Sequence, residues 1–503
     1  MTTDPLATLH ARLRELQHLN QAMALLGWDH EVTMPPRGAT GRAAQRATLA
    51  GVIHEKMVDA ELGVLLEDLG NDPALTADDR ANVREARRLR DRAVRLPRQL
   101  VHDLAETVGL AHAEWVAARE HDDWSRFAPH LARIVDLKRQ EARALDIGDE
   151  PYDALLDEFE PGARTAALLP VFADLEAALR DLLAGLDTAT PPPILPPGPY
   201  PRARQAALGR EVLVAMGYDL AAGRLDVSAH PFSESMGPGD VRVTTRYDED
   251  DLLSGLTATM HEGGHALYEQ GLPEELRDLP AGQAVSLGIH ESQSLLWENH
   301  VGRGRPFGTW LTGRLREHFP DRLAGLDPDH LVRVMNVVRP GLIRIEADEV
   351  TYNLHVILRL RIERALLNDE LDVADIPHTW RELSRDLLGV EVPDDRRGAL
   401  QDIHWCMGAI GYFPTYTLGK LYAAMFWNAA RRDLPDLDTH LAAGDCQPLR
   451  EWLGEHIHRQ AARQPAADLC REVCGHHLRA DDFVAHLRGK YAAPADPDTD
   501  PRE

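Results

Sequence analysis

The sequence predicts a mainly α-helical protein with one small β element, and three observations support this fold class. Apolar residues recur at spacings of three and four over most of the chain, which is the period of an amphipathic helix. Only one run, at 240–247, has the concentration of β-branched residues that is typical of a strand. Hydrophobic residues make up 44% and charged residues 27% of the 503 residues, as in a globular protein that buries a large core.

The N-terminal part, residues 1–187, is expected to be helical throughout. Leucine and methionine recur at helical spacing over 4–27, and this first helix is expected to stop around Trp28 and Asp29, before the loop Met34-Pro35-Pro36. A short helical segment after Tyr152 is closed by Glu160-Pro161-Gly162. Longer helices are predicted over 40–60, 76–147 and 164–186.

Prolines interrupt this pattern at 188–201, TATPPPILPPGPYP, where they favour extended polyproline geometry. One interpretation is a linker between two domains, and the other is a surface loop of one large domain. We favour a single domain because both flanks have the same helical character. Residues 202–491 would form its second part, and the Pro/Asp-rich tail at 492–503 is expected to be frayed.

The chain is organised around Leu253–Gly271, whose centre reads His261-Glu262-Gly263-Gly264-His265. Aspartates before this stretch suit a helix N-terminus, and Gly271 suits its end. Residues four apart lie on the same face of a helix, so both imidazoles can hold one metal ion while Glu262 reaches a water molecule on it. This arrangement is the minimal equipment for metal-assisted amide hydrolysis.

Two features beside this motif carry structural expectations. A glycine in mid-helix costs about 1 kcal/mol relative to alanine, so the pair at 263–264 suggests the close approach of a neighbouring helix or of a substrate. The strand expected at 240–247 leads directly into the metal helix. Such a strand commonly forms one wall of a cleft and pairs with the backbone of a bound peptide.

A catalytic zinc ion usually has three protein ligands, so one more is needed. The metzincin pattern fails, because Tyr268 and Gly271 stand where it requires glycine and histidine. A carboxylate from a following helix is the other common solution. Glu291 and Glu298 lie two helical turns apart and share a face, so either could serve, and His290 is a weaker candidate.

Composition restricts the classes of binding partner and the cellular compartment that can be expected. Lys and Arg number 55 against 81 Asp and Glu, and the net charge of −26 argues against a nucleic-acid or anionic-membrane surface. No apolar run reaches the roughly 18 residues of a membrane span, and the N-terminus shows no apolar region of a secretory signal. The four cysteines are too sparse for a disulfide scaffold, and the spacing of Cys470 and Cys474 is typical of an ordinary helix rather than of a second zinc site. A cytoplasmic location is expected.

A series of longer motifs makes the sequence more specific. In chain order these are His230-Pro231-Phe232, Asp240-Val241-Arg242-Val243-Thr244, His261–His265, His290-Glu291-Ser292-Gln293, Ile343–Asp348 and Gly398–Trp405. The series resembles that of the carboxypeptidase Taq family of metallocarboxypeptidases. Trp28-Asp29, Tyr152–Leu156 and Lys490-Tyr491 extend the resemblance over nearly the whole chain.

The resemblance implies a large helical, zincin-like metallopeptidase with a long substrate groove, which forms a homodimer. It implies the release of single amino acids from peptides that have a free C-terminus. Zinc, or cobalt in some members, is the implied metal, and Glu291 is the implied third ligand.

Chemistry then assigns the remaining roles. A metal ion held by His261, His265 and Glu291 is expected to activate a water molecule, with Glu262 as the general base and later the general acid. The tetrahedral oxyanion needs a further hydrogen-bond donor. Tyr416 is the first candidate for this donor, ahead of Tyr412 and His404.

An exopeptidase must also read the free carboxylate, and a planar, always charged guanidinium does this with two hydrogen bonds. By resemblance this role falls to Arg344, with Arg242 as the second choice. His230 is expected to line the site. Asp348 or Asp402 could orient a ligand imidazole, because ligating histidines usually need such a partner.

Alternatives remain at this point. An endo-acting or dipeptide-releasing zinc oligopeptidase could carry the same helical motif, and a scaffold without activity could keep the fold. Locally, Arg344 could form a surface ion pair with Asp348, and Tyr416 could simply pack in the core.

Overall fold

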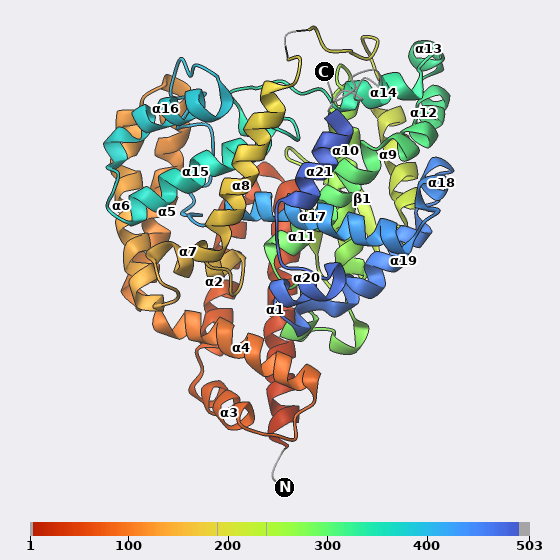
Figure 1. Ribbon diagram of the computed structural model, residues 1–503. Coiled ribbons are helices and arrows are strands. Elements are labelled where there is room, and N and C mark those ends of the chain that lie inside the picture. Colours follow the sequence, from red (N-terminus) through yellow and green to blue (C-terminus); the bar gives the residue numbers. More distant parts are fainter. Residues whose placement is uncertain (1–3, 189, 238, 492–503) are drawn as a thin grey trace, which may run out of the picture.

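The computed structural model describes residues 4–188, 190–237 and 239–491, and its regular structure is almost entirely helical (Figure 1). The α-helices are α1 Pro5–Val32, α2 Ala39–Met57, α3 Ala60–Gly70, α4 Ala77–Arg95, α5 Arg98–His121, α6 Trp124–Leu145, α7 Pro151–Phe159, α8 Thr165–Ala184, α9 Arg202–Met216, α10 Leu252–Gln270, α11 Leu287–Leu295, α12 Arg305–His318, α13 Pro320–Leu323, α14 Pro328–Met335, α15 Tyr352–Leu367, α16 Ile376–Leu388, α17 Pro414–Asp433, α18 Leu437–Ala442, α19 Gln447–His456, α20 Ala466–Cys474 and α21 Asp481–Tyr491. The strands are β1 Gly223–Val227, β2 Ser233–Ser235 and β3 Val241–Thr245. A π-helical turn, η4, spans Leu296–Gly302, and short 3-10 turns include η3 Pro280–Gly282 and η5 Arg344–Glu346.

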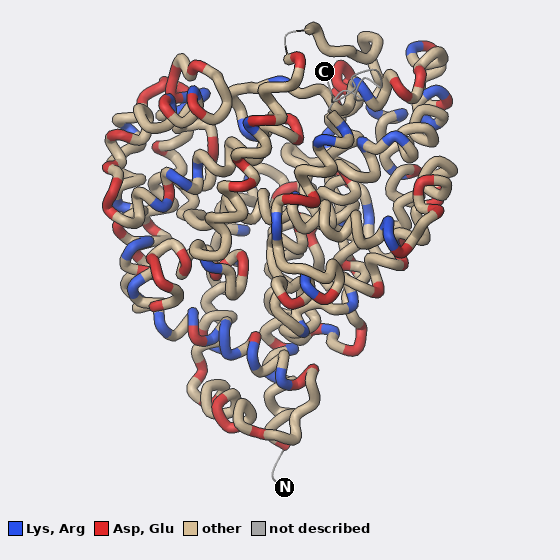
Figure 2. The backbone as a smooth tube through the Cα atoms, in the orientation of Figure 1, with Lys and Arg blue, Asp and Glu red and all other residues tan. Residues whose placement is uncertain are grey.

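Helices α11 and α17 lie at the centre of the molecule and pack against each other (Figure 1). Helices α5, α6, α15 and α16 form one side, whereas α9, α12, α18 and α19 form the other. The long helix α1 runs from the centre to the N-terminal end, where α3 and α4 lie beside it. Acidic and basic residues are intermixed along most elements (Figure 2), and no described helix is both long and apolar enough to cross a membrane.

The buried side chains form one large cluster and one small one. The large cluster takes residues from both sides of the Pro-rich segment, for example Leu175 before it and Val212 after it. The small cluster joins α1, α3 and α4 to η3. A core shared across 188–201 is what one domain requires, and the single-domain interpretation stays a prediction. Residue 189 and the tail at 492–503 lie outside the described residues.

The strand predicted at 240–247 is confirmed as β3, but it has two unexpected neighbours. β1 pairs with β3 in parallel and β2 pairs with it in the antiparallel sense, so the order is β1-β3-β2. Both were missed because they lack the β-branched run that marks β3: β1 has one β-branched residue, Val227, and β2 is only Ser-Glu-Ser. Since β3 has a partner on each side, the expectation that this strand pairs with a bound peptide is wrong. The outer edge of β2 is available instead.

Two predicted helix boundaries are also wrong. Helix α1 continues past Trp28 to Val32, because neither proline nor glycine lies between Trp28 and Pro35. Trp28 is buried, and the guanidinium group of Arg242 lies 4.4 Å from the centre of its ring. The range 76–147 divides into α4, α5 and α6, with Pro97 preceding α5 and Asp122 in the left-handed region at φ 54°.

The helix predicted around 261–265 is α10, and its glycine pair does mark close packing. Asp251 caps the helix by accepting a hydrogen bond from the Ser254 amide. A Cβ atom on Gly264 would lie 2.6 Å from Ser294 Cα in the backbone of α11. A Cβ atom on Gly263 would instead meet the ends of the Leu213 and Met216 side chains of α9. The neighbour is therefore a pair of helices, and α11 is the one whose backbone comes close.

This difference predicts unequal effects of alanine at the two glycines. Gly264→Ala should lower the free energy of unfolding by about 1–3 kcal/mol, because the backbone of α11 must move. Gly263→Ala should lower it less, because flexible side chains can shift and alanine is favoured over glycine in a helix by about 1 kcal/mol. Thermal unfolding midpoints of the two variants measure the difference. Equal losses would contradict the packing described for Gly264.

Candidate metal centre

Three side chains from two adjacent helices converge in the interior. His261 and His265 come from α10 and Glu291 from α11, and one donor atom of each lies within 4.8 Å of the others. The Glu291 Oε2 atom is 3.4 Å from His265 Nε2 and 3.9 Å from His261 Nε2. Among the described residues this is the one set of three or more His, Cys, Asp or Glu residues that could hold a metal ion.

The far nitrogen of each imidazole has a partner that fixes the ring. His261 Nδ1 lies 3.0 Å from Glu298 Oε2, and the other oxygen of Glu298 accepts a hydrogen bond from Arg303 at 2.6 Å. His265 Nδ1 lies 3.1 Å from the main-chain oxygen of His290. With Nδ1 engaged in this way, Nε2 of each ring is free to face a metal ion.

Spacing left Glu291, Glu298 and His290 open as third ligands and the resemblance implied Glu291; the structure places these three side chains differently. Glu291 lies in the group of three, whereas Glu298 lies behind His261, and His290 pairs through Nε2 with Glu269 at 2.9 Å. Glu298 belongs to the π-helical turn η4, a local geometry frequent at functional sites.

The expectation that Asp348 or Asp402 orients a ligand imidazole is wrong. Asp348 accepts hydrogen bonds from main-chain amides, including those of Arg339 and Thr351. Asp402 is bound by the guanidinium groups of Arg344 and Arg359. Sequence spacing could not show this, because the true partner, Glu298, lies beside His261 only after α10 and η4 pack.

The electrostatics of the group fit a divalent cation. Burial alone would lower the pKa of His261, but Glu291 and Glu298 raise it to about 10. Burial lowers the pKa of His265 to about 4, so this imidazole is neutral and ready to donate a lone pair. Burial would raise the pKa of Glu291, yet the two histidines hold it at about 2. One carboxylate and two imidazoles in a partly buried site are a donor set typical of zinc.

Glu262 lies beside these donors and is itself almost fully buried. Burial raises the pKa of its carboxyl group to about 7, although His261 acts in the opposite direction. A carboxyl group with a pKa near neutrality can both take up and give back a proton.

A second group of predicted residues gathers at the start of α17. The Tyr416 hydroxyl lies 3.1 Å from His404 Nε2, and the rings of Tyr412 and Tyr416 are 5.3 Å apart. One turn further along α17, a Cβ atom on Gly419 would lie 2.5 Å from Glu291 Cγ. Helix α17 therefore packs directly on the metal-site carboxylate, which brings the two groups together.

Arg344 belongs to this second group. Its Nε and Nη2 atoms donate to Asp402 Oδ1 at 3.0 and 2.8 Å, and its Nη1 donates to the Tyr352 hydroxyl at 2.6 Å. The guanidinium group lies 4.9 Å from the centre of the Tyr416 ring and is buried. The alternative of a surface ion pair with Asp348 is excluded. Sequence analysis missed Tyr352, which carries no pattern of its own.

Two other predicted residues lie on or next to the sheet instead. Arg242 in β3 makes a paired hydrogen bond with Asp240, at 2.7 Å for both contacts. His230 lies in the bend after β1 with an exposed side chain, outside the group of three.

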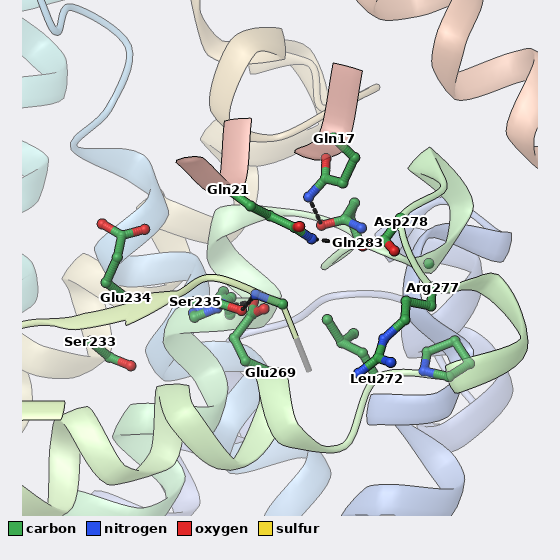
Figure 3. A pocket seen from close by; sticks show the side chains of 14 residues that line it. Gln17, Gln21, Ser233, Glu234, Ser235, Glu269, Leu272, Arg277, Asp278 and Gln283 are labelled. Atoms are coloured by element: carbon green, nitrogen blue, oxygen red, sulfur yellow. Dashed lines mark hydrogen bonds and ion pairs between the residues drawn. The ribbon is translucent and has the colours of Figure 1, made fainter. Parts of the chain in front are cut away.

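A polar cavity of about 260 Å³ opens beside the metal helix (Figure 3). Its wall includes Ser233, Glu234 and Ser235 of β2, Gln17 and Gln21 of α1, and Glu269 and His290. Figure 3 shows Glu269 rising from α10 toward Ser235, while Gln17 and Gln21 reach Gln283 and Asp278. Because His290 also lies against His265, the cavity adjoins the metal group.

The partner of His261 gives a test of this geometry. Glu298→Gln should weaken metal binding by about 10- to 100-fold, because the variant no longer holds the imidazole with a carboxylate. Asp348→Asn is the matched control and should bind metal as the wild type does, since Asp348 caps a turn away from both histidines. Competition with a chromophoric chelator measures both affinities, and equal losses would contradict the assignment.

Comparisons with known proteins agree with this site. The family described as carboxypeptidase Taq (M32) metallopeptidase matches residues 8–491. Thermostable carboxypeptidase 1 of Thermus thermophilus is 44% identical, with 95% of this chain and 97% of that protein covered; its namesake from Pyrococcus furiosus is 37% identical, with 96% and 97% covered.

Solved structures of two carboxypeptidases are also similar to this chain over nearly its whole length. A crystal structure of a carboxypeptidase of the same family from Deinococcus radiodurans has a TM-score of 0.94 and 38% identity, covering 97% of this chain and 98% of that one. Metallocarboxypeptidase 1 of Trypanosoma cruzi has a TM-score of 0.91 and 34% identity, covering 97% and 99%. With the fold, the metal group and the full-length similarity in agreement, the chain belongs to the carboxypeptidase Taq family and is a metallocarboxypeptidase, which hydrolyses the C-terminal peptide bond of peptides.

Proposed function

We propose that His261, His265 and Glu291 hold a zinc ion and that Glu262 is the general base of the carboxypeptidase reaction. The observation that carries this proposal is the convergence of the three donors within 4.8 Å, with the outer nitrogen of each imidazole already engaged. A bound zinc ion would supply Lewis acidity, which polarises the scissile carbonyl group and lowers the pKa of water towards neutrality.

The protein residues supply the proton transfers and the remaining stabilisation. Glu262 takes the proton of the attacking water and passes it to the leaving amine, a task suited to its pKa of about 7. The Tyr416 hydroxyl donates a hydrogen bond to the oxyanion, and His404 at 3.1 Å holds that hydroxyl in place. Tyr412 packs against the Tyr416 ring and supports its orientation.

Charge supports one direction for the peptide. Arg344 beside Tyr416 is the proposed reader of the C-terminal carboxylate, because its guanidinium group still has N–H bonds beyond those given to Asp402 and Tyr352. On the other side, the cavity beside β2 carries Glu234 and Glu269 and would repel a carboxylate. The amino-terminal part of the peptide would therefore run along the free edge of β2, toward this cavity.

A matched pair of peptides tests the reaction and the base together. An N-blocked peptide with a free C-terminus should lose single residues in sequence, whereas its amidated twin should remain intact, when products are followed by mass spectrometry. Glu262→Gln should lower kcat by about 100-fold or more, because proton transfer is lost while the ligands stay. Removing the metal with a chelator should stop cleavage, and zinc should restore it.

Internal cuts in both peptides would instead support the oligopeptidase alternative, which the comparisons with carboxypeptidases do not favour. Undiminished cleavage by the Glu262→Gln variant would remove this residue from the mechanism.

Lysine substitutions at the two candidate arginines separate their roles. Arg344→Lys should raise KM for free-acid peptides by about tenfold or more, because lysine keeps the charge but not the paired hydrogen bonds. Arg242→Lys is the control, since Arg242 pairs with Asp240 in the sheet, and its KM should stay near that of the wild type. Steady-state kinetics on a blocked dipeptide measure both, and the reverse order would transfer the role to Arg242.

Three finer features complete the proposal. Zinc is the proposed native metal, with cobalt as a functional substitute, and metal analysis of the purified protein identifies it. All four cysteines are free and buried, which fits a reducing cytoplasmic compartment. The proposed assembly is a homodimer, which light scattering in solution would measure.

A further inference from the structure

Glu160, just after α7, is a buried carboxyl group that the reaction does not use. Its side chain is 3% exposed, and Oε1 accepts a hydrogen bond from the Gly288 amide. The hydroxyl groups of Ser286 and Thr415 also lie near this carboxyl group and favour its charged form. No ion pair between described residues includes Glu160, so neutral donors alone hold this carboxyl group.

These donors belong to the two helices that build the site. Ser286 is the N-cap of α11 and Gly288 lies in its first turn. The Ser286 oxygen accepts from the Ile289 amide at 3.1 Å, which leaves its hydroxyl hydrogen for Glu160. A carboxyl group here also complements the positive end of the helix dipole. Glu160 therefore completes the N-terminal cap of α11.

The fit at this cap is tight. A Cβ atom on Gly288 would lie 2.7 Å from Glu160 Oε1, so only glycine lets the carboxyl group approach the amide. Burial raises the pKa of Glu160 to about 8, although Ser286, the Gly288 amide and Thr415 all favour its charged form. An uncharged amide of the same shape could therefore take its place.

The contacts at Gly288 and Thr415 lie within one helical turn of a proposed functional group. Glu291, the proposed third ligand, follows Gly288 by one turn of α11. Thr415 directly precedes Tyr416, the proposed oxyanion donor, in the first turn of α17. One carboxyl group is thus hydrogen-bonded to the first turn of α11 and faces the first turn of α17, close to Glu291 and Tyr416.

Helix α7 gives Glu160 a rigid base. The Tyr152 hydroxyl donates to Glu363 Oε2 at 2.7 Å, and the same oxygen accepts from the Gly411 amide at 3.1 Å. At the other end of α7, the Phe159 ring lies edge-on to Tyr412, with 5.1 Å between ring centres. These contacts explain a motif, Tyr152–Leu156, to which the reaction assigns no role.

We propose that Glu160 is a positioning residue, which holds the first turns of α11 and α17 so that Glu291 and Tyr416 meet at the metal group. It touches neither substrate nor metal. This inference rests on the proposed roles of Glu291 and Tyr416.

The test compares Glu160→Ala and Glu160→Gln with a control on the same helix, Asp153→Asn. Asp153 is equally buried and accepts from the Thr165 amide, the Thr165 hydroxyl and the Asp149 amide, at 2.7, 2.8 and 2.9 Å, but these donors lie outside α11 and α17. Four readouts are needed: zinc affinity by chelator competition, the visible spectrum of the cobalt form, kcat with KM, and the thermal midpoint.

Glu160→Ala should bind zinc about tenfold more weakly, shift the cobalt spectrum and lower kcat by about tenfold or more with little change in KM. Glu160→Gln should recover most of these losses, because its amide oxygen still accepts from Gly288. Asp153→Asn should lower the thermal midpoint while leaving zinc affinity and the cobalt spectrum unchanged.

The proposal is overturned if Glu160→Ala loses thermal stability alone, or if Asp153→Asn reproduces all of its losses.

Should Glu160→Ala not fold, Ser286→Ala and Thr415→Val each remove one contact. Ser286→Ala should weaken zinc binding. Thr415→Val should lower kcat and leave zinc affinity unchanged. If neither variant shows its expected effect, the proposal is also overturned. A failure of the proposed function would differ, since wild-type protein would then bind no zinc or cleave no free-acid peptide.

Discussion

The contact between α10 and α11 at Gly264 is the constraint on which the rest of the site depends. Two histidines on one helix can present a metal ion with only two ligands, and the third must come from a neighbour held at van der Waals distance. A side chain at 264 would push the α11 backbone away, because its Cβ would lie 2.6 Å from Ser294 Cα. The absence of that side chain brings Glu291 within 3.4 Å of His265 Nε2. The roughly 1 kcal/mol that a mid-helix glycine costs is thus exchanged for the close approach of Glu291, the proposed third ligand.

Burial then determines how the charges of the site behave. Buried charges are stable only when paired or hydrogen-bonded, and the structure supplies a partner for each one behind the metal group. Glu298 lies between His261 and Arg303, and Asp402 lies between Arg344 and Arg359. Glu160 and Glu363 instead accept hydrogen bonds from neutral donors, and burial raises the pKa of both carboxyl groups, to about 8 and about 7. The charge-paired Glu298 and Asp402 lie next to the proposed catalytic residues. Glu160 and Glu363, which have neutral partners, instead contact the helices that surround the site.

Sequence reasoning succeeded where the information was local. The helix around His261 and His265, its cap at Asp251 and the close packing at its glycine pair follow from spacing and residue type. The main strand was found because its β-branched run is local as well. β1 and β2 were missed because their stability comes from pairing with β3, and a three-residue strand of Ser-Glu-Ser has no pattern of its own.

By itself, the sequence determined the helical fold class, the two histidines with Glu262, and, through resemblance, a metallocarboxypeptidase family that the comparisons confirm. Spacing alone could not choose between Glu291 and Glu298, for which only the resemblance favoured Glu291, nor could it name Asp402 as the partner of Arg344, 58 residues away. Only the tertiary structure shows which of these side chains lie together. Contacts within a helix are set by a fixed period of 3.6 residues, whereas contacts between helices depend on how whole surfaces pack, and no spacing along one chain records that.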